Sequence, residues 1–116
     1  MNKEEISLRI VKSWLQRYGW KVIGDKTYTG YDILADKNGV VKKIEVKYRS
    51  MPNITKGTVD LTDRELKTCD FCLIAVFGPE PDNEYLGMLK IVPRQQPITT
   101  MYTPKHKIHL PFIGRK

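Results

Sequence analysis

The chain has few cysteines, and their arrangement excludes two common kinds of site. Cys69 and Cys72 are its only two, and they form a single Cys-x-x-Cys pair, which supplies half of a structural zinc site. A thioredoxin-type pair would open a helix directly after a strand, whereas this pair lies where a helix is expected to end. We therefore interpret both cysteines as reduced, half-buried thiols of an intracellular protein.

Long apolar runs are also absent. No segment approaches the roughly 20 apolar residues of a membrane-spanning helix, and Met1–Glu5 leads into an amphipathic stretch instead of the apolar core of a signal peptide. We expect a cytoplasmic location, or the host-cell interior if the protein is viral. The length of 116 residues suits one core. We expect residues 1–116 to form one domain, with a basic, proline-containing extension over roughly residues 94–116.

Acidic residues are scarce relative to basic ones. The sequence contains 13 aspartates and glutamates against 20 lysines and arginines, which gives a formal net charge of +7. Such a basic excess favours polyanions, and nucleic acids are the commonest of these partners. Net charge also keeps a protein soluble, so this observation leaves open whether the partner is DNA, RNA or neither.

The first segment has the periodicity of an amphipathic helix over residues 3–18. Gly19 suits the end of this helix. Glu4 projects onto the apolar face, so the helix directs one carboxylate to the side on which its core residues lie. That face carries Leu8, Val11, Trp14, Leu15 and Tyr18.

Strand patterns occupy most of the chain from there to residue 92. A capping-box sequence from Thr62 to Glu65 starts a short second helix. The order helix, three strands, helix, two strands predicts an α/β fold with a mixed sheet of about five strands flanked by helices. The run 71–77 is apolar throughout, which predicts a central strand covered on both faces. The strand patterns fall at 20–23, on both sides of Asn38-Gly39, and at 58–61, 71–77 and 85–92.

The central feature of the sequence is a predicted β-hairpin that turns at Asn38-Gly39. This dipeptide suits a two-residue type I′ turn, because both positions tolerate positive φ. With that turn as the loop, Lys37 faces Val40, and Asp32 would lie opposite Glu45 at a Cβ separation of roughly 5 Å. Like charges in opposed positions destabilise a sheet. A divalent cation is the simplest compensation.

The residues around this acid pair suit phosphodiester hydrolysis. Mg²⁺ prefers oxygen ligands and keeps several waters, so Asp32, Glu45 and the Val46 main-chain carbonyl would suffice to hold it. Lys47 lies on the strand face of Glu45, where it could polarise the attacking water and balance phosphate charge. Glu4 is a further candidate ligand. Taken singly, each of these residues also fits an ordinary role: a solvated ion pair, a turn acid or a helix N-terminal charge.

These residues resemble a known family. Gly30-Tyr31-Asp32-Ile33 and Ile44-Glu45-Val46-Lys47 resemble the signature of the PD-(D/E)xK nuclease superfamily, with its restriction-endonuclease-like fold. The likeness covers residues 1–92 and is greatest to small archaeal Holliday junction resolvases and to the NO VEIN-like branch. Tyr31 replaces the proline of the superfamily's name, at a position that varies among members.

The resemblance implies an activity and a set of roles. It implies a DNA endonuclease of the junction-resolving, repair, recombination or restriction type, dependent on Mg²⁺ or Mn²⁺ and acting as a homodimer. Its catalytic residues would be Glu4, Asp32, Glu45 and Lys47. Two other functions stay open: a nucleic-acid-binding domain without activity, and a viral or mobile-element module that docks a partner protein through its basic surface.

Several basic residues are candidates for contact with nucleic acid. Arg49 shares the strand face of Lys47, which suits a phosphate contact. The basic end of the chain either grips a nucleic-acid backbone or forms an edge strand whose lysines discourage aggregation. His106 and His109 have no partner ligands nearby in sequence, and we interpret them as surface histidines. The candidate contacts are Lys43, Arg49, Lys56, Lys105 and Lys107.

Overall fold

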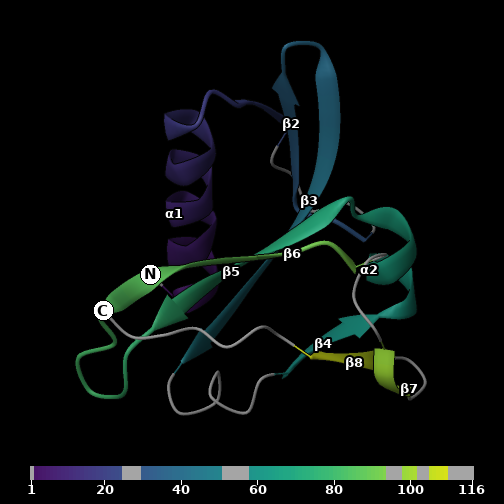
Figure 1. Ribbon diagram of the computed structural model, residues 1–116. Helices are drawn as coiled ribbons and strands as arrows, with labels where there is room; N and C mark the ends of the chain where they lie inside the picture. The colour runs from purple at the N-terminus through teal and green to yellow at the C-terminus, as the bar shows by residue number, and fades with distance from the viewer. Residues whose placement is uncertain (1, 25–29, 51–57, 94–97, 102–104, 110–116) are drawn as a thin grey trace.

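The computed structural model describes residues 2–24, 30–50, 58–93, 98–101 and 105–109. Two helices and eight strands are found in these ranges (Figure 1). In chain order they are α1 (Lys3–Arg17), β1 (Lys21–Gly24), β2 (Ile33–Lys37), β3 (Val40–Ser50), β4 (Thr58–Thr62), α2 (Asp63–Thr68), β5 (Phe71–Phe77), β6 (Tyr85–Ile91), β7 (Ile98–Met101) and β8 (Lys105–His109).

The main sheet has five strands in the order β1-β2-β3-β5-β6. The pair β3–β5 is parallel, and the other three pairs are antiparallel. Helix α1 packs along one face of this sheet, while α2 precedes β5 and packs Leu66 against the opposite face (Figure 1). The predicted mixed α/β sheet is therefore confirmed.

The predicted hairpin register is also confirmed. Asn38 and Gly39 have φ angles of 53° and 84°, as a type I′ turn requires, and Lys37 pairs with Val40. The β2–β3 ladder ends at the Ile33–Ile44 pair, but β3 continues to Ser50 alongside β5. The second half of β3 thus has an edge that β2 does not cover.

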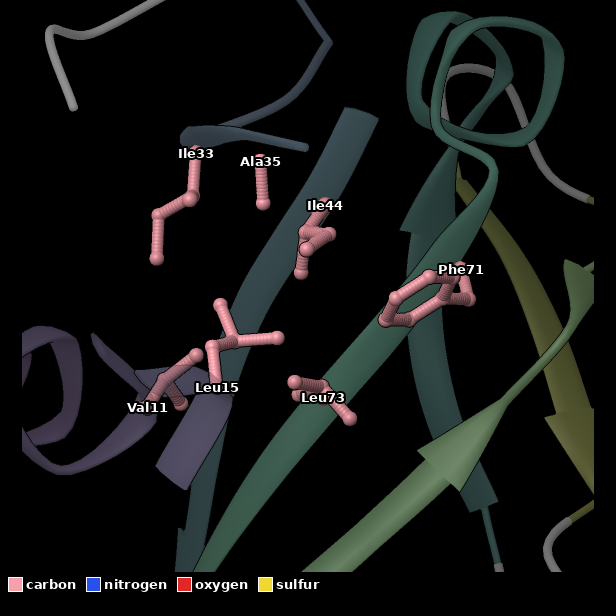
Figure 2. Close-up of a cluster of buried hydrophobic side chains, with 7 residues drawn as sticks. All are labelled: Val11, Leu15, Ile33, Ala35, Ile44, Phe71 and Leu73. Carbon is pink, nitrogen blue, oxygen red and sulfur yellow. The ribbon is translucent and has the colours of Figure 1, made fainter. Parts of the chain in front are cut away.

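Two apolar clusters lie on opposite faces of the sheet. The first joins α1 to the sheet through Val11, Leu15, Ile33, Ala35, Ile44, Phe71 and Leu73 (Figure 2). The second consists of Leu61, Cys72, Ile74, Val76 and Ile91. Strand β5 contributes to both clusters, and all seven of its residues are buried. This explains its uniformly apolar sequence, since neither face meets water.

Some expectations need correction. Cys69 and Cys72 are free thiols as predicted, but both are fully buried instead of half-buried, and burial raises the pKa of Cys69 to about 12. Tyr18 is 54% exposed and does not join the core, because α1 ends at Arg17. Strand β3 extends beyond Lys47 through Tyr48–Ser50.

The basic end of the chain contains β7 and β8. Strand β8, which carries Lys105 and Lys107, is the middle strand of a three-stranded sheet ordered β4-β8-β7. The interpretation of this lysine-bearing segment as an edge strand is therefore wrong. Across the described ranges, no helix has the length and apolar character to cross a membrane.

Gly30 determines how the chain passes α2 immediately before the hairpin. Its φ is +87°, and a Cβ atom there would lie 2.8 Å from the Thr68 Cβ and 3.1 Å from the Arg64 main-chain oxygen. Only glycine fits both the backbone angle and the close contact. The segment immediately before Asp32 is consequently held against α2.

Candidate active site

A pocket of about 770 Å³ lies at the uncovered edge of β3, within the size range of ligand sites in proteins. The N-terminal half of α1 contributes Lys3, Glu4, Ser7 and Leu8 to the lining. Strand β3 contributes every residue from Glu45 to Ser50. Asp32 and Glu80 complete the lining. The pocket therefore exists because β3 extends beyond the end of its pairing with β2, and because α1 lies next to this unpaired part of the β3 edge.

Asp32 directly precedes β2, at the end of the hairpin ladder, and its main chain and side chain continue the hydrogen bonding to β3. Its main-chain N–H donates to the Ile44 carbonyl at 2.9 Å. Its Oδ2 accepts a hydrogen bond from the Val46 N–H, also at 2.9 Å. The carboxylate thus satisfies a strand N–H that β2 leaves unpaired, and Asp32 bonds to both neighbours of Glu45.

The Val46 carbonyl faces the same edge as Asp32. In an extended strand the N–H and C=O of one residue point to the same side, and the Val46 N–H points to Asp32. The Val46 side chain packs with the α1 cluster. A main-chain oxygen and a carboxylate are therefore presented together at the pocket.

Glu45 is buried, with 6% of its surface exposed. It lies on the sheet face opposite to Ile44 and Val46. Burial, followed by the negative charges of Asp32 and Glu65, raises the pKa of the Glu45 carboxyl from 4.5 to about 9. Near neutral pH and without a bound cation, this carboxyl is therefore protonated, and it is not the solvated strand acid that one of the sequence interpretations allowed.

Lys47 lies between two carboxyl groups. Its Nζ is 3.5 Å from Glu45 Oε2 and donates to both Glu65 carboxylate oxygens at 3.1 Å. Burial favours a lower pKa for Lys47, but the charges of Glu65 and Glu45 outweigh it and raise that pKa above its ordinary value. Lys47 is therefore a fixed cation, which suits charge balance better than proton abstraction.

Glu65 is a site residue that the sequence interpretation missed. It is the third residue of α2, where its Oε1 accepts from the Thr62 N–H at 2.9 Å in the predicted capping box. Burial favours a raised pKa for Glu65, but the Thr62 N–H and the Lys47 charge outweigh it and lower the pKa. The capping box was visible in the sequence, but its proximity to Lys47 was not, since 17 residues separate them.

Glu4 and two basic residues lie around the same pocket. Glu4 is exposed in the first turn of α1 and lines the pocket. Lys3 Nζ donates to Ser50 Oγ at 3.1 Å and to Glu80 Oε1 at 3.3 Å, which links α1 to the end of β3 and to the β5–β6 turn. Arg49 also lines the pocket, and its guanidinium donates to the Tyr48 carbonyl at 2.6 Å.

Of the other candidate nucleic-acid contacts, only Lys43 has a described side chain, and it is not among the described residues that line the pocket. Lys43 is exposed on β3, with its Nζ 5.7 Å from the centre of the Tyr31 ring. Lys105 and Lys107 belong to β8, which pairs with β4. Lys56 lies outside the described residues. The structure thus brings together Glu4, Asp32, Glu45, Val46, Lys47 and Arg49 from the predicted set.

Oxygen ligands at the pocket are of the kind that Mg²⁺ prefers. Within the described ranges, no group of three or more histidine, cysteine, aspartate and glutamate side chains is arranged to hold a metal ion. A cation here would be held by the Asp32 and Glu45 carboxylates, the Val46 carbonyl and water. That donor set fits Mg²⁺, which usually retains several waters and needs only one or two carboxylates.

Comparison with known families identifies the chain. Residues 3–80 match the family described as Protein NO VEIN, C-terminal. The chain belongs to this family. The matched range runs from α1 through β5, so the NO VEIN C-terminal region includes every residue of the candidate site named above. No curated protein matches the chain significantly.

Two solved structures share the fold of this NO VEIN family member. Hjc of Archaeoglobus fulgidus, a Holliday junction resolvase, has 17% sequence identity and a TM-score of 0.62, with 93% of this chain and 84% of that chain covered. The bacterial homing endonuclease I-Ssp6803I has 18% identity and a TM-score of 0.52, with coverages of 97% and 75%. The restriction-endonuclease-like fold and the NO VEIN-like branch expected from the sequence are thereby confirmed.

Proposed function

We propose that this NO VEIN family member is a metal-dependent nuclease that hydrolyses phosphodiester bonds in DNA. The main observation in support of the proposal is that Glu4, Asp32, Glu45 and Lys47 line one pocket. They come from a loop, one strand and a helix, and a purely structural sheet edge has no need of this combination. The structural similarity to a resolvase and a homing endonuclease supports the same proposal.

In this proposal each polar group has a role in hydrolysis. Asp32, Glu45 and the Val46 carbonyl hold Mg²⁺ or Mn²⁺, and Glu4 supports the surrounding water. The cation, when bound, supplies Lewis-acid stabilisation of the phosphoryl oxygens. Lys47 orients the attacking water and balances the charge that develops on the phosphate. Arg49 contacts a neighbouring phosphate, and cleavage leaves a 5′-phosphate.

The substrate that we propose is DNA recognised by shape. The described part of the chain has little structure beyond the nuclease-like sheet and its small second sheet, so the room for reading base sequence is limited. A four-way junction is the first substrate to test, because Hjc is a Holliday junction resolvase. Two symmetric cuts need two sites, so the proposal includes a homodimer.

A domain that binds nucleic acid without cutting it is the second candidate. It is favoured by the absence of a three-ligand cluster among the described residues and by the contact of Glu45 with Lys47. A cleavage panel with Mg²⁺ and Mn²⁺ separates the two candidates. It contains four-way junctions, flaps, nicked and linear duplexes, and RNA. If the protein binds these substrates but leaves all of them intact, the nuclease proposal is wrong.

Asp32→Ala tests the metal site directly. We expect it to weaken Mn²⁺ binding at least tenfold, on the order of 1.4 kcal/mol, because one of the two carboxylate ligands is lost. Isothermal titration of Mn²⁺ measures this effect. Asp82→Ala is the matched control, because Asp82 is exposed in the β5–β6 turn and its replacement should leave Mn²⁺ binding unchanged. Equal Mn²⁺ affinity in both variants would remove Asp32 from the site.

Glu65→Gln tests whether Glu65 positions Lys47. The amide keeps the size of the side chain but removes the charge that holds the ammonium at 3.1 Å. We expect cleavage to slow by roughly tenfold to a hundredfold, in line with the loss of an orienting neighbour, with DNA affinity unchanged. Single-turnover cleavage measures the rate.

The control for this variant is Thr62→Ala. It removes the hydroxyl that accepts from the Glu65 N–H and weakens the start of α2 by about 1 kcal/mol, but it leaves the Glu65 carboxylate in place. If Glu65 acts through Lys47, Glu65→Gln adds nothing in a Lys47→Ala background. Additive losses in the double variant would assign Glu65 a separate role.

A further inference from the structure

One buried polar side chain at the pocket has no use in the proposed function. Ser7 is 1% exposed on α1, and its hydroxyl has no hydrogen-bond partner among the residues that the structure describes. It lines the same pocket as Glu4, Asp32 and Glu45. A serine inside a helix usually bonds back to a carbonyl of the preceding turn, and Ser7 does not.

An unpartnered buried hydroxyl destabilises a fold, so its presence needs a reason. Alanine would fill the same position without a polar atom and with a higher helix propensity. Ser7 lies three residues after Glu4, so both side chains project from the same face of α1. The hydroxyl therefore lies on the side of α1 that lines the pocket with Glu4, where a ligand that enters the pocket can satisfy it.

We propose that the Ser7 hydroxyl holds a water molecule in the hydration shell of the divalent cation bound at Asp32 and Glu45. This inference rests on the proposed function. Mg²⁺ and Mn²⁺ keep several waters when the protein supplies only one or two carboxylates, and groups that bond to those waters strengthen binding of the metal. Ser7 is thus a positioning residue, which contacts the shell and not the cation.

Ser7→Ala tests the inference through the stability of the metal-free protein, which should rise, and the affinity for Mn²⁺, which should fall. Without metal, the variant should unfold at a higher temperature than wild type, because the unpartnered hydroxyl is gone. Its dissociation constant for Mn²⁺ should rise roughly tenfold, because one hydration-shell contact is lost. Thermal unfolding in a chelator and isothermal titration of Mn²⁺ measure the two effects. Ser13→Ala on the exposed side of α1 should change neither quantity.

Each other outcome has a definite meaning. Unchanged Mn²⁺ affinity in Ser7→Ala, with the Asp32→Ala effect intact, overturns the Ser7 inference alone. Weaker binding of a four-way junction in chelator, with Mn²⁺ affinity unchanged, assigns the hydroxyl to a phosphate and also overturns it. If wild type itself binds no Mn²⁺, the metal-dependent function fails, and the Ser7 inference fails with it.

Discussion

Glu45→Gln should make the metal-free protein more stable while it abolishes cleavage. The Glu45 carboxyl is buried and has a pKa of about 9 against an ordinary 4.5. At pH 7.5 the unfolded chain carries this carboxylate ionised, and folding must protonate it. Glutamine removes that cost. We expect a gain on the order of 1–3 kcal/mol in the free energy of unfolding, since one pKa unit corresponds to about 1.4 kcal/mol.

The raised pKa of Glu45 also predicts how the free energy of unfolding changes with pH. The pKa of Glu45 is higher in the folded state than in the unfolded state, so folding takes up a proton between pH 4.5 and about 9. The stabilisation linked to that proton is complete below pH 4.5 and is lost as the pH rises towards 9. The wild-type free energy of unfolding should therefore fall with rising pH across this range, and Glu45→Gln should flatten the slope.

Denaturant unfolding at pH 5.5 and 8, in a chelator, measures both effects. Glu84→Gln is the matched control, because Glu84 is exposed near β6 and its replacement should not alter the slope. The Glu45→Gln protein should also lose Mn²⁺ binding, because a neutral amide replaces a carboxylate ligand. Its single-turnover cleavage should be at least a hundredfold slower than that of wild type. A Glu45→Gln protein that cleaves at the wild-type rate would exclude Glu45 from the chemistry.

Lys47→Ala should have the second large effect. We expect cleavage to fall by on the order of a hundredfold to a thousandfold, comparable to the loss of one electrostatic group that stabilises a transition state. DNA affinity should stay within about twofold, because Lys47 is bonded to Glu65 and Glu45 and contributes little free charge to the surface. Single-turnover rates and fluorescence anisotropy of a labelled junction separate these quantities.

The same variant should also be less stable than wild type. The loss of Lys47 leaves the partly buried Glu65 carboxylate and the buried Glu45 carboxyl without a cation, which we expect to cost about 2 kcal/mol. Lys47→Met controls for this loss of packing, because it restores most of the side-chain volume without the charge. If Lys47→Met recovers cleavage along with stability, the charge of Lys47 has no role in the reaction.

The sequence by itself determined the hairpin and its register. Asn38-Gly39 admits one kind of tight turn, and side-chain alternation then fixed which residues faced each other. The uniformly apolar run of β5 indicated a strand with two covered faces. These features depend on local backbone preferences and on periodicity, which a single sequence carries in full.

Only the tertiary structure decided which neighbours surround each acid. The parallel β3–β5 pairing carries Glu45 onto the face covered by Leu61 and α2, and this burial turns an apparent surface acid into a protonated one. Helix α2 brings Glu65 to Lys47 across 17 residues of sequence, and α1 brings Ser7 to the pocket. Burial and charge coupling depend on contacts between distant segments, so residue spacing along the chain does not reveal them.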